Sequence, residues 1–381
     1  LCRIKVICIG MNTYWKGIRM EIRNFQAYDV GNVYNEYKVK KEVCPLYSSI
    51  TIEYPTRLNA MAIDPSGITE NKNMHYSPGE VVFSTEIKIK VRITLNDEDK
   101  DVYVGENHNR ISVVKHTCEI MRKALNYKGH FNVELVKLHN FRHCGLGSTG
   151  AIQASIGAGI NYMFGNPIAQ KNLVKYLAQN YGEEIDGDEE HLMPVQCIGG
   201  SAASGIYKGG VFVLAGESTV ISRGTISEDY VIVLGIPKNY KCQDAKTQFE
   251  EEEKNIDKFK ECGRLYRTQI AYNILHQFLP AVVHQDVKTM GDVIFDYRYN
   301  MGSIQNCSYT YEDMPQIMEE LKFLKTEGLV DVLAISSVGP LVFAIGKDVT
   351  VCKKEFEKRN LNVYCTHINN DSFRILNETK I

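Results

Sequence analysis

The feature that most constrains the fold is a glycine-rich junction at residues 141–150, FRHCGLGSTG. The preceding segment, residues 130–140, has strand character, and the residues that follow place apolar and small side chains on one face of a helix, as packing against a sheet requires. Backbone N–H groups at the start of a helix are unpaired, and the helix dipole adds partial positive charge. Strand, loop and helix together therefore predict a cradle for a phosphate group.

The cradle residues are expected to hold a diphosphate and a metal ion. Ser148 or Thr149 could cap the helix and also contact a phosphate-bound Mg²⁺. The loop lacks the GK[ST] ending of a P-loop, so an ordinary strand-to-helix turn remains an alternative. A metal set of His139, His143 and Cys144 is disfavoured because the three ligands would not share one face. The predicted diphosphate-binding residues are His143, Gly145, Leu146, Gly147, Ser148, Thr149 and Gly150.

Length and composition describe a globular protein of two domains. The 381 residues exceed what one compact domain usually needs. The 44 basic and 46 acidic residues nearly balance, which argues against nucleic acid or an anionic membrane as a partner. The 11 cysteines form no CxxC pair, and no apolar run has membrane-spanning length, so we expect a reduced, cytoplasmic protein. Because the chain opens on Leu1, translation could start at Met11 or Met20.

A polar segment divides the chain. We expect an N-terminal extension over residues 1–46 and a phosphate-binding domain over residues 47–237. A polar linker over residues 238–258 then leads to a C-terminal domain over residues 259–381. Within the linker, the run EEEE at residues 250–253 is typical of a solvated helix face.

Two further glycine and serine segments, residues 198–210 (IGGSAASGIYKGG) and 336–340 (SSVGP), also lie next to strands. Three glycine- and serine-rich loops next to strands are more than tight turns alone usually require. We therefore expect the three loops to form one substrate-binding crevice. The residues predicted to line it are Asn59, Gly200, Ser201, Ser204, Gly205, Tyr207, Ser336, Ser337 and Gly339.

The segments YPTRLNAMAID (54–64), HCGLGSTGAIQ (143–153) and LAISSVGPLVFAI (333–345) resemble, in order, three motifs of one superfamily. Its members are galactokinase, homoserine kinase, mevalonate kinase and phosphomevalonate kinase (the GHMP kinases), and the chain looks most similar to the branch of beta-ribofuranosylaminobenzene 5'-phosphate synthase. The resemblance implies an α+β fold with an N-terminal domain like ribosomal protein S5 and a ferredoxin-like C-terminal domain. It also implies Mg²⁺ with ATP or phosphoribosyl pyrophosphate as the donor.

Two departures from the family pattern affect the expected reaction. The kinases carry an aspartate where this sequence has Tyr207, and a tyrosine with a pKa near ~10 is a poor base at neutral pH. Asp64, Asp186 or Asp188 could take its place. Asn59 replaces a histidine of the synthase branch, which leaves the acceptor open.

The leading hypothesis is therefore a transferase that releases pyrophosphate from phosphoribosyl pyrophosphate. Arg57 and Asp64 would face the acceptor, and Ser148 would lie nearest the metal. The alternatives are an ATP-dependent kinase of a small metabolite and a non-catalytic sensor of a nucleotide or metabolite. The expected partners are small-molecule substrates, and a homodimer is an open possibility.

Overall fold

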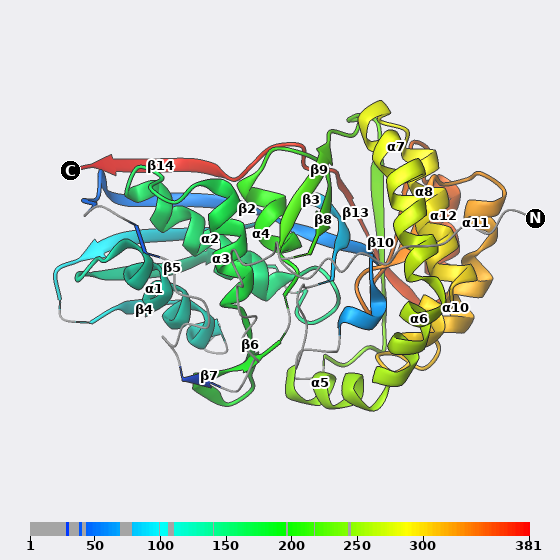
Figure 1. The fold of residues 1–381 in the computed structure, drawn as a ribbon, viewed down its shortest axis with the longest axis horizontal. Coiled ribbons are helices and arrows are strands. Elements are labelled where there is room, and N and C mark those ends of the chain that lie inside the picture. Colours follow the sequence, from blue (N-terminus) through cyan, green and yellow to red (C-terminus); the bar gives the residue numbers. More distant parts are fainter. Residues whose placement is uncertain are drawn as a thin grey trace, which may run out of the picture.

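The computed structural model describes residues 28–29, 38–39, 43–68, 78–98, 100–105, 110–139, 141–195, 197–216, 218–242 and 245–381. The two candidate start residues, and most of the predicted N-terminal extension, lie outside these ranges. The described chain forms two α+β domains that lie side by side (Figure 1). No helix in the described part of the chain is both long and apolar enough to cross a membrane.

The first domain is a mixed sheet covered by helices. The path β14-β2-β3-β5-β4 is antiparallel except for the parallel pair β4–β5, and β8 and β9 extend it from β3. Helices α2 and α4 pack against β2 and β3 (Figure 1). The elements are β2 (Tyr47–Ala62), η1 (Pro65–Ile68), β3 (Glu80–Asn96), β4 (Val102–Val104), α1 (Ile111–Leu125), β5 (His130–Lys137), α2 (Ser148–Met163), α3 (Gln170–Gln179), α4 (Gly200–Ile206), β8 (Val211–Ala215), β9 (Thr219–Gly224) and β14 (Arg374–Lys380).

The core of this domain follows from the sequence pattern. The alternating residues of β3, among them Ile89, Val91 and Ile93, are buried, as period-two patterning predicts. Helix α2 approaches the sheet closely because its inner face carries small residues. A Cβ on Gly159 would come within 2.7 Å of Cδ1 of Ile93. This tight contact holds the C-terminal half of α2 against β2 and β3.

The second domain has a four-stranded antiparallel sheet in the order β11-β12-β10-β13. With helices after β10 and after β12, this is the predicted ferredoxin-like arrangement. Its helices form the layer at the right of Figure 1. The elements are β10 (Val231–Pro237), α5 (Ala245–Lys254), α6 (Ile256–Asn273), η3 (Ile274–Phe278), α7 (Leu279–His284), α8 (Val287–Phe295), η4 (Asp296–Asn300), α9 (Ser303–Asn306), α10 (Met314–Leu321), α11 (Phe323–Thr326), β11 (Val332–Ile335), β12 (Val342–Gly346), α12 (Thr350–Lys358) and β13 (Leu361–His367).

The domain boundaries differ from the predicted ones. β10 belongs to the second sheet because it pairs with β12 and β13, so the second domain begins before residue 231. β14 follows the second domain in sequence but pairs with β2 of the first. Residues 245–254 of the predicted linker form α5.

Two glycine-containing segments outside the main sheets form regular structure, and the first of them was predicted as a loop. Residues 200–206 form α4, which begins after Gly199 at a φ of +110°. The acidic segment 183–191 contributes to a small sheet of β1 (Tyr28–Asp29), β6 (Gly182–Ile185) and β7 (Asp188–Pro194). Its turn carries Asp186 and Gly187, and an Asp-Gly pair is a strong hairpin signal.

Candidate functional site

The glycine loop enters α2 through backbone conformations that favour glycine. Gly145 has a φ of +110° and Gly147 a φ of +63°, and Gly147 directly precedes the first turn of α2. There is no room for a side chain at Gly147. A Cβ there would lie 2.7 Å from Oγ of Ser201 and 3.0 Å from Nε of Arg57. The loop therefore presents bare backbone at a helix start, with an arginine beside it.

The structure brings the three predicted motif segments into contact. The Ser336 hydroxyl donates to the Gly145 carbonyl at 2.6 Å and accepts from the Asn59 amide at 2.9 Å. The Ser337 amide donates to the Asn59 carbonyl at 2.8 Å. The Arg57 guanidinium donates to the Gly145 carbonyl at 2.9 Å. Residues 55–64, 143–150 and 336–340 thus meet, although they lie far apart in the sequence.

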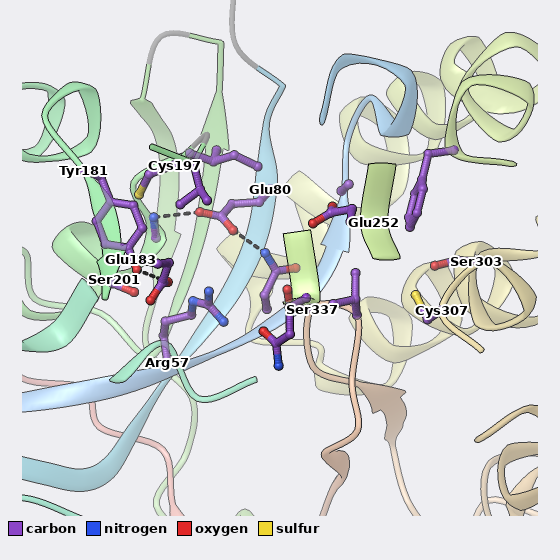
Figure 2. Close-up of a pocket in the computed structure, with 18 of the residues that line it drawn as sticks. Arg57, Glu80, Tyr181, Glu183, Cys197, Ser201, Glu252, Ser303, Cys307 and Ser337 are labelled. Atoms are coloured by element: carbon purple, nitrogen blue, oxygen red, sulfur yellow. Dashed lines mark hydrogen bonds between the residues drawn. The ribbon is translucent and has the colours of Figure 1, made fainter. Parts of the chain in front are cut away.

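A cavity of about 260 Å³ lies beside this meeting point, between the two domains (Figure 2). It is lined by charged residues from both domains and by several apolar side chains. The lining residues are Arg57, Asn59, Ala62, Glu80, Tyr181, Glu183, Val195, Cys197, Ile198, Gly200, Ser201, Gln248, Glu252, Phe259, Tyr297, Arg298, Ser303, Cys307, Ser337 and Val338.

Glu80, the first residue of β3, ties the start of α4 to β2. Its carboxylate accepts a hydrogen bond from the Gly200 amide at 2.6 Å and another from the side-chain amide of Asn59. Burial raises the pKa of Glu80, and the positive charge of Arg57 acts in the opposite direction. Both carboxylate oxygens are therefore engaged by the protein, which gives Glu80 a positioning role.

Glu183 on β6 is engaged at only one oxygen. Its Oε1 accepts from the Tyr181 hydroxyl, whereas Oε2 is buried and has no hydrogen-bond partner among the described residues. His143 Nδ1 lies 4.0 Å from Oε2, and Nε2 of the same ring is also unpartnered within the described ranges. Burial raises the pKa of Glu183 to about 7 and lowers the pKa of His143, so the imidazole is neutral at pH 7.

A buried ion pair supports the first turn of α2. Arg110 pairs with Glu184 and also donates to Oγ1 of Thr149 at 3.0 Å and to Oγ of Ser148 at 3.2 Å. The Thr149 hydroxyl in turn donates to Glu184 at 2.6 Å. The hydroxyls of Ser148 and Thr149 therefore face a guanidinium, whose charge opposes a cation at the same place.

Three side chains that could bind a metal ion lie next to the ion pair of Arg110 and Glu184. The ligand atoms of His143, Glu183 and Glu184 lie within 4.8 Å of one another. Glu184 is already engaged by Arg110 and Thr149, and Mg²⁺ prefers oxygen to imidazole nitrogen. The free Oε2 of Glu183 is therefore the ligand in this group that best fits Mg²⁺.

The residues predicted to line the crevice divide into two groups. Asn59, Gly200, Ser201 and Ser337 line the cavity. The other predicted lining residues are Ser204, Gly205, Tyr207, Ser336 and Gly339, and they do not. Ser204 and Ser336 are fully buried and hydrogen-bonded to carbonyls of neighbouring loops and helices.

The assignment of Tyr207 to the crevice is a clear misplacement. Tyr207 ends α4, whereas Gly200 and Ser201, which line the cavity, begin it. Seven helical residues separate the two ends by about 10 Å. The Tyr207 ring instead lies under the guanidinium of Arg223, at 5.2 Å.

The three aspartates considered as substitutes also lie outside the cavity lining. Asp64 accepts from the amide and hydroxyl of Ser66 at the start of η1. Asp186 pairs with Arg142, and Asp188 with His191.

The carboxylates that do line the cavity are Glu80, Glu183 and Glu252, none of which the sequence singled out. They come from β3, β6 and α5, and they carry no shared motif. The one signal in the sequence is the acidic composition of residues 183–191, whose first residue, Glu183, lines the cavity. The EEEE run was expected to face solvent, yet its third residue, Glu252, faces the cavity (Figure 2).

Comparison with known proteins agrees with this geometry. Residues 112–200, which include the glycine loop, match the family model of the GHMP kinases N terminal domain. The chain matches no curated protein sequence.

Solved structures share the fold at low sequence identity. Homoserine kinase from Cytophaga hutchinsonii superposes with a TM-score of 0.54 at 14% identity, over 91% of this chain and 100% of that one. Mevalonate diphosphate decarboxylase from Staphylococcus aureus superposes with a TM-score of 0.57 at 13% identity, over 87% of this chain and 99% of that one. Mevalonate-3-kinase from Thermoplasma acidophilum, solved with mevalonate 3-phosphate and ADP, gives 0.54 at 12% identity, over 86% and 99%.

Proposed function

We propose that the chain is an ATP-dependent kinase of the GHMP type that phosphorylates a hydroxyl group of a small molecule, since residues 112–200 match the GHMP kinases N terminal domain and the fold resembles that of homoserine kinase. One observation carries the proposal. The bare helix start at Gly147 adjoins Arg57 and Ser201, and these two residues line the cavity together with the carboxylates, whereas residues 143–150 themselves do not line it. A phosphate donor and an acceptor can therefore lie next to each other.

In this proposal the loop amides hold the phosphates of ATP. The N–H groups at the start of α2 and the dipole of this helix of 16 residues stabilise negative charge. Arg57 adds a guanidinium whose buried Nε has no partner among the residues described. A donor in this position stabilises the charge that the transferred phosphoryl group carries in the transition state.

Glu183 is the carboxylate best placed to receive the proton of the acceptor hydroxyl. It lines the cavity, and its Oε2 is free to accept. The acceptor oxygen then attacks the γ-phosphorus, and the bond from that phosphorus to the β-phosphate oxygen breaks, releasing ADP. Mg²⁺, when bound with ATP, would neutralise phosphate charge.

The structure removes the main reason for preferring phosphoribosyl transfer. That preference depended on Tyr207 at the catalytic place, and Tyr207 lies outside the cavity lining. A cavity with three carboxylates offers the base that Tyr207 could not supply.

The test is a donor comparison. The protein is incubated with Mg²⁺, a pool of small hydroxylated metabolites and either ATP or phosphoribosyl pyrophosphate, and ADP and pyrophosphate release are measured separately. We expect ADP release that depends on the pool and is lost in Gly147→Val and reduced in Ser148→Ala. Pyrophosphate release from phosphoribosyl pyrophosphate would instead support the synthase, and ligand binding without turnover would support a sensor.

A further inference from the structure

The end of the cavity that is lined by the second domain contains a carboxylate that the proposed phosphoryl transfer does not use. Glu252 lies on α5, four residues after Gln248, so both side chains face the cavity from one side of this helix. Figure 2 shows Glu252 between Glu80 and Cys307, whereas Arg57 and Ser201 lie on the other side of Glu80.

The Glu252 carboxylate makes no hydrogen bond or ion pair with any residue that the structure describes. Its pKa is raised to about 7, and burial is the cause. Arg298, the guanidinium of the second domain that lines the cavity, donates to the carbonyls of Asn59 and Ala60 and to the Ser303 hydroxyl, which are all neutral acceptors.

The walls around this carboxylate are mostly apolar. Phe259, Tyr297 and Cys307 line the same part of the second domain, and each is at most 5% exposed. Their surfaces lower the local dielectric constant, which strengthens the attraction between a carboxylate and a cation. An unpaired carboxylate in such a place is costly unless a ligand supplies a positive charge or several hydrogen-bond donors.

We propose that this end of the cavity binds a protonated amine of the acceptor, with Glu252 as its counter-ion. The identification of the ligand as the acceptor rests on the proposed kinase function, whereas the amine site itself rests on the cavity. The acceptor would then carry its hydroxyl toward Glu183 and its ammonium group toward Glu252. An acidic acceptor is disfavoured because its carboxylate would face Glu252.

The neighbours of Glu252 favour an amine over a neutral polyol. The two guanidiniums that line the cavity donate to backbone carbonyls, Arg57 to Gly145 and Arg298 to Asn59 and Ala60, and neither forms an ion pair with Glu252 among the described residues. An ammonium group would supply the missing counter-ion. A polyol hydroxyl would satisfy the hydrogen bonding of Glu252 but would leave this charge unpaired.

Three ligands with the same two-carbon skeleton test the proposal. Ethanolamine, glycolate and ethylene glycol are titrated without nucleotide, and their dissociation constants are measured by NMR. We expect ethanolamine to bind wild type most tightly and to lose about 10- to 100-fold in affinity in Glu252→Gln, the range for a hydrogen bond to a charged group. Glu250→Gln, an exposed residue of the same helix, serves as the control and should bind like wild type.

The outcomes separate this inference from the kinase proposal. If ethanolamine does not bind, binds no better than ethylene glycol, or binds Glu252→Gln unchanged in a variant that melts like wild type, the amine site is wrong. Because no nucleotide is present, failure of the protein to use ATP leaves this result intact. Amine binding without ADP release would refute the kinase and keep the site.

Discussion

At the scale of single residues, the proposed phosphate cradle requires glycine at position 147, because a larger residue there would collide with Ser201 and Arg57. We expect Gly147→Ala to weaken ATP binding at least about tenfold, or about 1.4 kcal/mol, because its Cβ would displace Arg57 or Ser201. Calorimetric titration with ATP measures this. Gly187→Ala is the matched control, since Gly187 also has a positive φ but nothing lies within 4 Å of the place a Cβ would take. Equal losses in both variants would mean that backbone strain, not crowding, is responsible.

If Glu183 is the base of the proposed kinase reaction, it sets the pH dependence of that reaction. A base must be ionised, and the pKa of Glu183 is raised from 4.5 to about 7, so we expect kcat/KM to rise with pH and level off above pH 7. Glu183→Gln should lower kcat by about 10²- to 10⁴-fold and flatten the rise. A pH profile of ADP release checks both effects. An unchanged profile in the variant would exclude Glu183 as the base.

Glu252 should make the free protein less stable at high pH. Its folded-state pKa, about 7, lies above the ordinary value of 4.5, so between these values the native state binds more protons and stability falls as pH rises. We expect Glu252→Gln to raise the free energy of unfolding by about 1–3 kcal/mol at pH 8 and to change it little at pH 4.5. Urea unfolding at both pH values measures this. A destabilised variant at pH 8 would show that the carboxylate has a partner.

At the scale of elements, the start of α2 depends on one buried ion pair. Arg110→Met would leave Glu184 charged, fully buried and without its counter-ion, so we expect a loss of about 3–5 kcal/mol in unfolding free energy. Chemical denaturation checks it. The control is Arg264→Met, which removes an exposed i,i+3 pair with Glu261 and should leave stability unchanged within error.

The elements also show how far the sequence could predict this protein. The glycine loop was predictable because strand, glycines and helix are adjacent in the chain, and the three motif segments suggested a common crevice. The carboxylates that line the cavity were not predictable, because Glu80, Glu183 and Glu252 become neighbours only through the packing of β3, β6 and α5. The misplacement of Tyr207 has the same origin. The motif shows that Tyr207 follows Gly200 and Ser201 in the sequence. It does not show that the seven residues of α4 carry Tyr207 away from the cavity that Gly200 and Ser201 line.

At the scale of the whole molecule, Arg298 connects the two domains. It belongs to η4 of the second domain and is 2% exposed, and it donates to two backbone carbonyls of β2 in the first. We expect Arg298→Met to leave these carbonyls unpaired, lowering Tm and splitting one calorimetric transition into two. Arg267→Met, an exposed residue of α6, should keep one transition. A single transition in both would mean that other contacts couple the domains.

Because β14, the last strand of the chain, pairs with β2, the first sheet cannot be completed until the whole chain has been synthesised. β2 leaves the ribosome early, but its outer neighbour follows more than 300 residues later, after every strand of the ferredoxin-like domain. Throughout that interval the nascent first domain has an unpaired edge, which is open to pairing with other chains. Completion of the first domain therefore waits for the second, and the cell must protect that edge until the last strand arrives.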